Sequence, residues 1–416
     1  MKRKLFSVIL ISATIAVLCG MSFYAFFDKT TVSESENRRL ETLPAFTLSS
    51  WKSDDFQTKM NTFISDHVYK REKWISYAQW LEDKMKLPGK DLILSGTSEG
   101  NEQGDRTETD YLVLDDHILP LYTHNDNSMM YFYESNKALL AAVKKAIPSV
   151  KEYYMIMPGR IDYEPDDIRK NADDSEPDIE AIYKNTDPSI KTIYTHDAVR
   201  EGVEKYGIND IYFRTDHHWT QLGSYFAARE FCNTIGRPID LSNYTAHNAY
   251  DFQGYLTVKM NLTENYDPDP LVYYLRNDGV NCPETVYLKD ENTGAIQPVN
   301  DTVINEYRGG YYTYIYKSQF AYTVVDGTGP EGTTLTMVTD SYGLALSTWL
   351  TDAYDTIVIV DPRYYTGTDE NFLQLLVKYN TTDFLLALQE DEMCVSMFNQ
   401  EMAANLLGVN ADEFKQ

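Results

Sequence analysis

The residues that could do chemistry gather in one short stretch, residues 212–220, which reads YFRTDHHWT. Asp216 and His218 are two positions apart, so their side chains project to the same side of an extended backbone. A carboxylate beside an imidazole fixes the tautomer of the ring and stabilises its protonated form, as a general base requires. This stretch supplies an acid and a base, and the nucleophile must come from elsewhere in the chain.

A candidate nucleophile, Ser341, follows a predicted strand over residues 333–338 and precedes a predicted helix over about 342–353. A serine at such a turn exposes its hydroxyl at the sheet edge, where backbone N–H groups at the helix start can stabilise an oxyanion. Asp340 and Ser341 are also preferred helix N-caps, so the turn alone has a purely structural interpretation. Two polar segments at strand ends of one domain favour a triad of Ser341, His218 and Asp216.

The neighbours of His218 are expected to be structural. On an extended chain His217 points away from Asp216 and His218, and Trp219 is expected to pack beneath the loop. Two adjacent histidines beside an aspartate could suggest a metal, but consecutive side chains diverge and no third ligand is evident nearby. We therefore predict neither a metal site nor a cofactor.

Strand and helix patterns alternate along most of the chain, and a short aromatic strand is expected at 212–213. Further strands are expected over residues 111–114, 153–157, 191–195, 333–338, 356–360 and 384–388, with helices over about 128–146, 197–206, 220–236, 342–353 and 369–379. This alternation predicts an α/β fold, a three-layer sandwich with a mostly parallel sheet covered on both faces. An exposed acidic insertion is expected over 162–190, and a β-rich insertion over about 240–330.

The first residues are typical of a membrane anchor. Basic residues at positions 2–4 precede an apolar run from Leu5 to Phe27, which is long enough to span ~30 Å of hydrocarbon as a helix. Positive charge before the helix keeps the N-terminus cytoplasmic, so the rest of a single-pass protein would face the outside of the cell membrane. We predict an anchor helix over residues 1–27, a stalk and membrane-proximal helical region over 28–87, and the α/β domain over 88–416.

Charge excludes one class of partner. The 416 residues include 37 Lys and Arg against 63 Asp and Glu, a formal net charge of −26. Such a surface repels phosphate backbones, so no nucleic-acid partner is expected. Cys232, Cys282 and Cys394 show neither paired nor metal-binding spacing, although a single Cys232–Cys282 disulfide stays open.

The serine turn and the distant Asp-x-His pair resemble the SGNH (GDSL) hydrolase superfamily. The six residues from Thr215 to Thr220 match the signature of the DHHW family, which is related to the AlgX/AlgJ-type alginate O-acetylation proteins. The resemblance implies an SGNH-like fold with permuted motif order, in which Ser341 is the nucleophile, His218 the base and Asp216 its orienting residue. It also implies a site arginine after the next strand. Arg363 is the candidate for this oxyanion or substrate-binding role, with an ion-paired loop residue as the alternative.

The sequence departs from the hydrolase pattern in two respects: Thr339 stands where a glycine precedes Asp-Ser, and the separate glycine and asparagine oxyanion donors of ordinary SGNH enzymes are not identified. The resemblance implies an outward-facing acetyltransferase or esterase that acts on a cell-surface or exported polysaccharide. A membrane O-acyltransferase partner would deliver the acetyl group, because cytosolic donors are absent outside the cell. The alternative is a catalytically inactive carbohydrate-binding or scaffold protein with the same fold.

Overall fold

The structure is a computed structural model. It describes residues 20, 23–30, 32–33, 38–46, 55–71, 73–74, 77, 92–94, 109–289, 296–304, 320–366 and 370–410. The chain divides into two compact units. One comprises Met1–Lys90 with Tyr255–Asp267, and the other comprises Asp91–Gly254 with Pro268–Gln416.

In the described part of the smaller unit, the named elements are β1 (Val32–Ser33), β2 (Arg38–Arg39), α3 (Asp55–Asp66) and α11 (Tyr255–Lys259). His67 is buried here, with Nδ1 2.9 Å from the carbonyl oxygen of Phe63 and Nε2 3.0 Å from that of Thr30. Most of the predicted anchor run, residues 5–27, lies outside the described residues. Within the described part of the chain, no helix is both long and apolar enough to cross a membrane.

The larger unit is built on an eight-stranded sheet in the order β11-β10-β12-β14-β13-β15-β6-β7. The strands from β14 to β7 in this order run parallel to one another, and β12, β10 and β11 continue the sheet with antiparallel pairing. The bounds of the strands are β6 (Lys151–Met157), β7 (Lys191–Tyr194), β10 (Pro283–Lys289), β11 (Ile296–Thr302), β12 (Phe320–Asp326), β13 (Thr334–Thr339), β14 (Thr356–Val360) and β15 (Asp383–Gln389).

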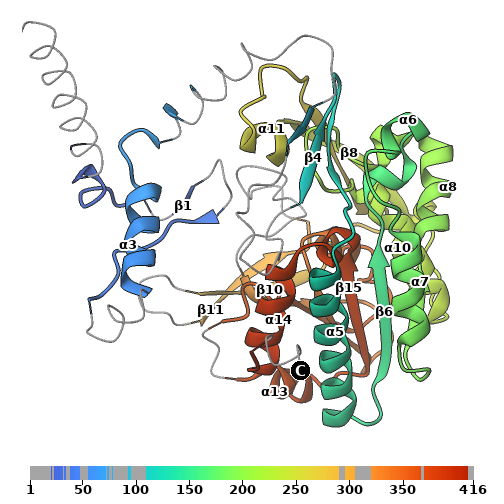
Figure 1. The fold of residues 1–416 in the computed structure, drawn as a ribbon. Coiled ribbons are helices and arrows are strands. Elements are labelled where there is room, and N and C mark those ends of the chain that lie inside the picture. The colour runs from blue at the N-terminus through green and yellow to red at the C-terminus, as the bar shows by residue number, and fades with distance from the viewer. Residues whose placement is uncertain are drawn as a thin grey trace, which may run out of the picture. The chain divides into compact units, whose positions relative to one another are not determined.

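Helices cover both faces of this sheet because its central strands are apolar on both sides (Figure 1). In β6, Tyr153 and Met155 point into one core, and Tyr154 and Ile156 point into the other. The first core is covered by α8 (His196–Tyr206), α10 (Gln221–Thr234) and α12 (Tyr342–Ser347); the second by α5 (Asp126–Ala146), α7 (Glu176–Asn185), α13 (Phe372–Lys378) and α14 (Ser396–Met402). The predicted mixed α/β fold with a large central sheet is confirmed.

Short elements complete the larger unit. One small sheet has the order β3-β4-β5, and β8 pairs with β9 in a second. Their bounds are β3 (Leu92–Leu94), β4 (Asp110–Val113), β5 (Ile118–Leu121), β8 (Tyr244–Phe252) and β9 (Asp269–Arg276). The remaining helices are η1 (Arg160–Tyr163), α6 (Asp166–Arg169), α9 (Ile208–Ile211), η2 (Leu241–Asn243), η3 (Glu390–Met393) and η4 (Ala403–Leu407).

Two predicted insertions are more integrated than expected. The acidic stretch 162–190 was expected to be exposed, but its helix α7 buries Ile179 and Ile182 in the second core. These apolar residues are three apart and so share one helix face, which outweighs the surrounding acidic residues. Within 240–330, β12 and β10 extend the central sheet. The unpaired edge of the parallel strand β14 offers backbone N–H and C=O groups to β12, and β12 in turn pairs with β10.

The carboxyl group of Glu152 on β6 is buried, and its Oε1 has no hydrogen-bond partner. Burial raises the pKa of Glu152 to about 7, against the opposing charge of Lys144. Because the pKa in the folded state lies above the unfolded value, stability falls as pH rises from about 4.5 to about 7. We expect Glu152→Gln to raise the melting temperature by ~2–4 °C at pH 8 and much less at pH 5.

Differential scanning calorimetry at the two pH values measures this difference. The matched control is Glu180→Gln on the exposed face of α7, which should leave the pH dependence unchanged. An equal change in melting temperature for Glu152→Gln at pH 5 and pH 8 would contradict the raised pKa of the buried Glu152 carboxyl.

Candidate active site

The stretch with the two histidines forms a tight loop between α9 and α10. Tyr212 and Trp219 form an isolated antiparallel bridge, and the Phe213 N–H donates to the carbonyl oxygen of His218 at 3.2 Å. The strand predicted at 212–213 is therefore wrong, since these residues form a bridge across the loop and not a strand of the sheet. The extended backbone assumed for Asp216 and His218 is also wrong.

Asp216 folds the loop by bonding to a residue two positions later. Its Oδ1 accepts the His218 backbone N–H at 3.0 Å and lies 2.7 Å from His218 Nδ1. Aspartate favours such turns because its carboxylate can replace a backbone acceptor. Both side chains are buried. A carboxylate only accepts hydrogen bonds, so the ring proton sits on Nδ1 and the lone pair of Nε2 faces the other way.

Ser341 lies at that second nitrogen. It follows β13 and precedes α12, and its Oγ is 2.7 Å from His218 Nε2. The two residues are 123 positions apart in the chain. The structure thus brings together Ser341, His218 and Asp216 in the order of nucleophile, base and orienting acid that acyl transfer uses.

Asp340, rather than Ser341, caps the turn after β13. Its Oδ1 accepts the Tyr342 N–H at 2.8 Å, and its Oδ2 accepts the Gln389 N–H from β15 at 2.6 Å. The side chain of Ser341 makes no capping hydrogen bond. Burial raises the pKa of Asp340 to about 6, although the two N–H donors and the charge of Arg363 oppose this shift. The capping function and the candidate nucleophile therefore belong to neighbouring residues.

Tyr342 joins the loop at residues 212–220 to the turn that holds Ser341 through two hydrogen bonds. Its backbone oxygen accepts a hydrogen bond from Trp219 Nε1 at 3.0 Å, and its hydroxyl donates to the carbonyl oxygen of His217. Trp219 is fully buried, as predicted for a side chain beneath the loop. Sequence reasoning missed Tyr342, although its position directly after Ser341 was a signal that it would contact the same loop.

A second carboxylate holds the loop from the opposite end. Asp269 on β9 accepts hydrogen bonds from the Thr215 N–H at 2.7 Å, the Thr215 hydroxyl at 2.5 Å and the Arg214 N–H at 3.1 Å. The Gly254 N–H donates to Thr215 Oγ1 at 2.8 Å. A Cβ on Gly254 would lie 2.6 Å from Asp216 Cβ, so only glycine permits this approach. The sequence around Asp269 and Gly254 does not reveal these contacts, because each residue contacts the loop across a long separation in the chain.

Thr339, which stands where the hydrolase pattern has a glycine, packs closely against Gly343 in the first turn of α12. A Cβ placed on Gly343 would lie 2.7 Å from Thr339 Cβ, closer than folded chains allow. The small residue of the hydrolase pattern therefore has a counterpart four positions later, on the first turn of α12.

Arg363 lies after β14 as expected, and its side chain is held by an ion pair. Its Nε and Nη2 donate to the Asp361 carboxylate at 3.0 and 2.6 Å. Asp361 raises the pKa of Arg363 against the effect of burial. This geometry matches the ion-paired alternative for Arg363, and its role toward an oxyanion or substrate stays a prediction.

Asp216, His217 and His218 also present ligand atoms within 4.8 Å of one another. The same Asp216 oxygen receives two donors from His218, and His218 Nε2 faces the Ser341 hydroxyl. An ion would have to displace these contacts, so the residues fit proton transfer better than metal binding.

Fold and site together define a mixed α/β protein with a serine, a histidine and an aspartate in a hydrogen-bonded row at the edge of a large sheet. A model of the DHHW protein family matches residues 89–360, and the chain belongs to this family. The resemblance predicted from residues 215–220 is confirmed. No curated protein matches the chain.

The first two of the following solved structures share the fold. A DHHW family protein from Eubacterium siraeum is 23% identical, with a TM-score of 0.57 over 76% of this chain and 99% of that one. Bacillus cereus PatB1 with a sulfonyl adduct is 19% identical, with a TM-score of 0.54 over 74% of this chain and 98% of that one. The O-acetyltransferase domain of Pseudomonas putida AlgJ is 12% identical over 77% of this chain and 100% of that one, with a TM-score of 0.38.

The Tyr342 hydroxyl should stabilise the protein through the loop. Tyr342→Phe leaves the His217 carbonyl without this donor, and we expect a loss of about 1–3 kcal/mol in the free energy of unfolding. The control is Tyr354→Phe, because the buried hydroxyl of Tyr354 has no hydrogen-bond partner and its removal should be neutral or stabilising. Denaturant titration measures both variants. Equal effects of the two substitutions would contradict the link between Tyr342 and the loop.

The close approach of Gly343 to Thr339 gives a coupled pair. Gly343→Ala alone should destabilise the protein by about 1–3 kcal/mol through overpacking, although alanine is the better helix former. In a double-mutant cycle with Thr339→Gly, the alanine should cost much less. Additive effects in the cycle would show that the two residues do not share the space.

Proposed function

We propose that the protein transfers an acyl group, in the first place acetyl, through a covalent ester on Ser341. The observation that carries this proposal is the continuous hydrogen-bonded row from Asp216 Oδ1 through His218 to Ser341 Oγ, with 2.7 Å at each step. These distances are those at which a base can take the hydroxyl proton of a nucleophile.

In the first half-reaction, His218 Nε2 takes the proton of Ser341 Oγ while that oxygen bonds to the carbonyl carbon of the donor ester. The tetrahedral intermediate then expels the donor alcohol, which receives the proton from His218. In the second half-reaction His218 deprotonates an acceptor hydroxyl, whose oxygen bonds to the acyl carbon of the Ser341 ester. The bond from that carbon to Ser341 Oγ then breaks, and His218 returns the proton to Oγ, which leaves the acylated acceptor and the free serine. Asp216 stays ionised throughout and stabilises the imidazolium of each half-reaction.

The acceptor we propose is a hydroxyl group of a cell-surface or exported polysaccharide. This proposal is supported by the membership in the DHHW family, by the predicted anchor over residues 1–27 and by the acidic net charge, which disfavours polyanionic substrates. Outside the cell, the acetyl group would be delivered by a membrane O-acyltransferase partner. With water as acceptor the same chemistry gives an acetylesterase.

Ser341 should be the site of covalent labelling. A sulfonyl fluoride, a reagent class that modifies activated hydroxyl groups, is expected to add one adduct to the wild-type protein and none to Ser341→Ala. The control Ser189→Ala removes an exposed hydroxyl that contacts only a carboxylate of its own turn, and should label normally. Intact-mass and peptide mass spectrometry give the stoichiometry and the position.

Turnover provides the second test. With p-nitrophenyl acetate, Ser341→Ala should abolish the enzymatic rate, and Asp216→Asn should lower kcat by ~10⁴ because the amide favours the wrong His218 tautomer. Equal acetyl-ester turnover by wild type and Ser341→Ala would sink the proposal. Oligosaccharide binding without labelling or turnover would support the inactive scaffold instead, and acetyl appearing on sugar rather than as free acetate would identify a transferase.

A further inference from the structure

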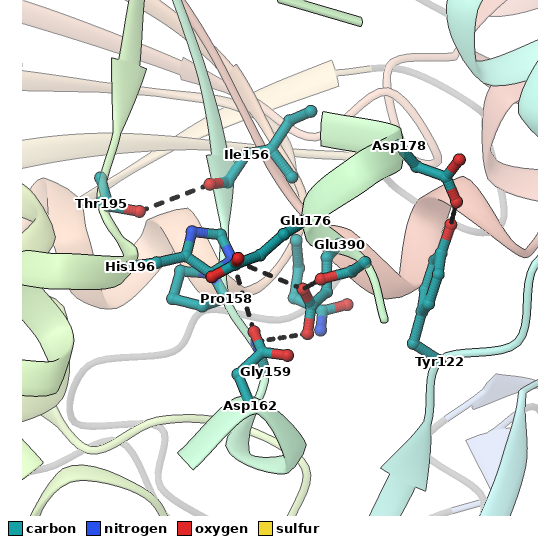
Figure 2. Close-up of polar contacts among 12 residues, drawn as sticks. Tyr122, Ile156, Pro158, Gly159, Asp162, Glu176, Asp178, Thr195, His196 and Glu390 are labelled. Atoms are coloured by element: carbon teal, nitrogen blue, oxygen red, sulfur yellow. Dashed lines mark hydrogen bonds and ion pairs between the residues drawn. The ribbon is translucent and has the colours of Figure 1, made fainter. Parts of the chain in front are cut away.

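A second cluster of a histidine and two carboxylates lies inside the larger unit and shares no residue with the candidate active site. His196 begins α8 directly after β7, Asp162 is in η1 after β6, and Glu390 begins η3 directly after β15. Figure 2 shows the three side chains pointing toward one another from these segments. They therefore link the carboxyl ends of three neighbouring strands of the sheet.

The cluster is almost completely enclosed. The side chains of His196, Glu390 and Asp162 are 1%, 0% and 16% exposed. His196 Nε2 lies 3.4 Å from Asp162 Oδ2 and 3.7 Å from Glu390 Oε2, and all three ligand atoms lie within 4.8 Å of one another.

The imidazole of His196 is not satisfied by hydrogen bonds in this enclosure. Both of its ring nitrogens and Asp162 Oδ2 are buried without a hydrogen-bond partner. His196 Nε2 has the two carboxylates only at ion-pair distance, and burying such groups without hydrogen bonds is costly, so their convergence on one point needs a physical reason. By contrast, Glu390 is anchored: its Oε1 accepts the Gly159 N–H and its Oε2 accepts the Ser175 hydroxyl, each at 2.7 Å.

We propose that Asp162, His196 and Glu390 bind a divalent first-row transition-metal ion, and that Zn²⁺ fits best. Imidazole nitrogen and carboxylate oxygen are both ligand types that Zn²⁺ accepts. Ligands about 2.0–2.1 Å from a tetrahedral ion are separated by about 3.3–3.4 Å, whereas octahedral Mg²⁺ requires about 2.9 Å. The observed separations of 3.4 and 3.7 Å are close to the tetrahedral value.

Charge balance favours the same assignment. Two carboxylates and a neutral imidazole carry two negative charges, which a divalent ion neutralises in a buried site.

The ion would brace the strands that support the candidate active site. Glu390 follows Gln389, whose N–H holds the Asp340 carboxylate before Ser341. On the other side, Arg160 in the same η1 turn as Asp162 donates to the carbonyl oxygen of Phe213 at 3.3 Å, just before the Asp216 loop. The role we assign to the metal is therefore structural, and it does not depend on the proposed acyl transfer.

Metal content and thermal unfolding of the full chain test the proposal. The protein is purified without immobilised metal, its metal content is measured by plasma mass spectrometry, and the chelated form is titrated with ZnCl₂ at pH 8. We expect about one Zn²⁺ per chain and a rise of ~5 °C or more in melting temperature on adding Zn²⁺. Asp162→Asn should weaken Zn²⁺ binding by ~10-fold or more, and His196→Gln should abolish it.

The chain offers a matched control in His124, whose ring nitrogens lie 2.8 and 3.0 Å from Asp178 and Asp126 but whose side chain is 44% exposed. His124→Gln should leave metal content and the Zn²⁺-induced shift unchanged. Wild-type protein with no metal and no shift at pH 8 would overturn the proposal. If Asp162→Asn retained the metal and His218→Gln lost it, the ion would lie at Asp216, His217 and His218, which would also overturn the proposal.

Discussion

The contact between His218 Nε2 and Ser341 Oγ is the interaction on which the rest of this arrangement depends. It joins segments 123 residues apart in the chain. These two segments, both within the described residues, are not connected by a regular ladder of backbone hydrogen bonds. A loop that leaves the sheet must be positioned by side chains, and the entropy of fixing it must be offset by specific bonds. Tyr342 and Trp219 supply these bonds, and each is the direct chain neighbour of Ser341 or His218.

Buried carboxylates do most of this positioning. Asp216 shapes the loop, Asp269 holds its start, and Asp340 holds the turn before Ser341. Each accepts at least two N–H or O–H donors, which is the condition under which a buried carboxylate stabilises a fold instead of weakening it. These carboxylates hold His218 and Ser341 in fixed positions, which is the preorganisation that the proposed acyl transfer requires.

The cluster of His196, Asp162 and Glu390 is built differently. Glu390 has donors from Gly159 and Ser175, whereas the ring nitrogens of His196 have none. The carboxylates around Ser341 have hydrogen-bond donors, whereas the nitrogens of His196 lack hydrogen bonds, and this difference is the basis for proposing an ion at His196. Both regions meet at the end of β15, where Gln389 holds Asp340 and Glu390 enters the cluster.

Composition and periodicity alone determined the mixed α/β fold, the main strands and the burial of Trp219, because these follow from local apolar patterns. The motif at residues 215–220 also determined the family, and together with the turn at Ser341 it indicated which residues could form a triad. Tertiary structure alone decided that 212–213 is a bridge, that α7 is part of the core, and that Cys232, Cys282 and Cys394 are free thiols. It also decided the roles of Tyr342, Asp269 and Gly254. Their contacts span long separations in the chain, where a single sequence carries no periodic signal and only the packed fold sets which groups meet.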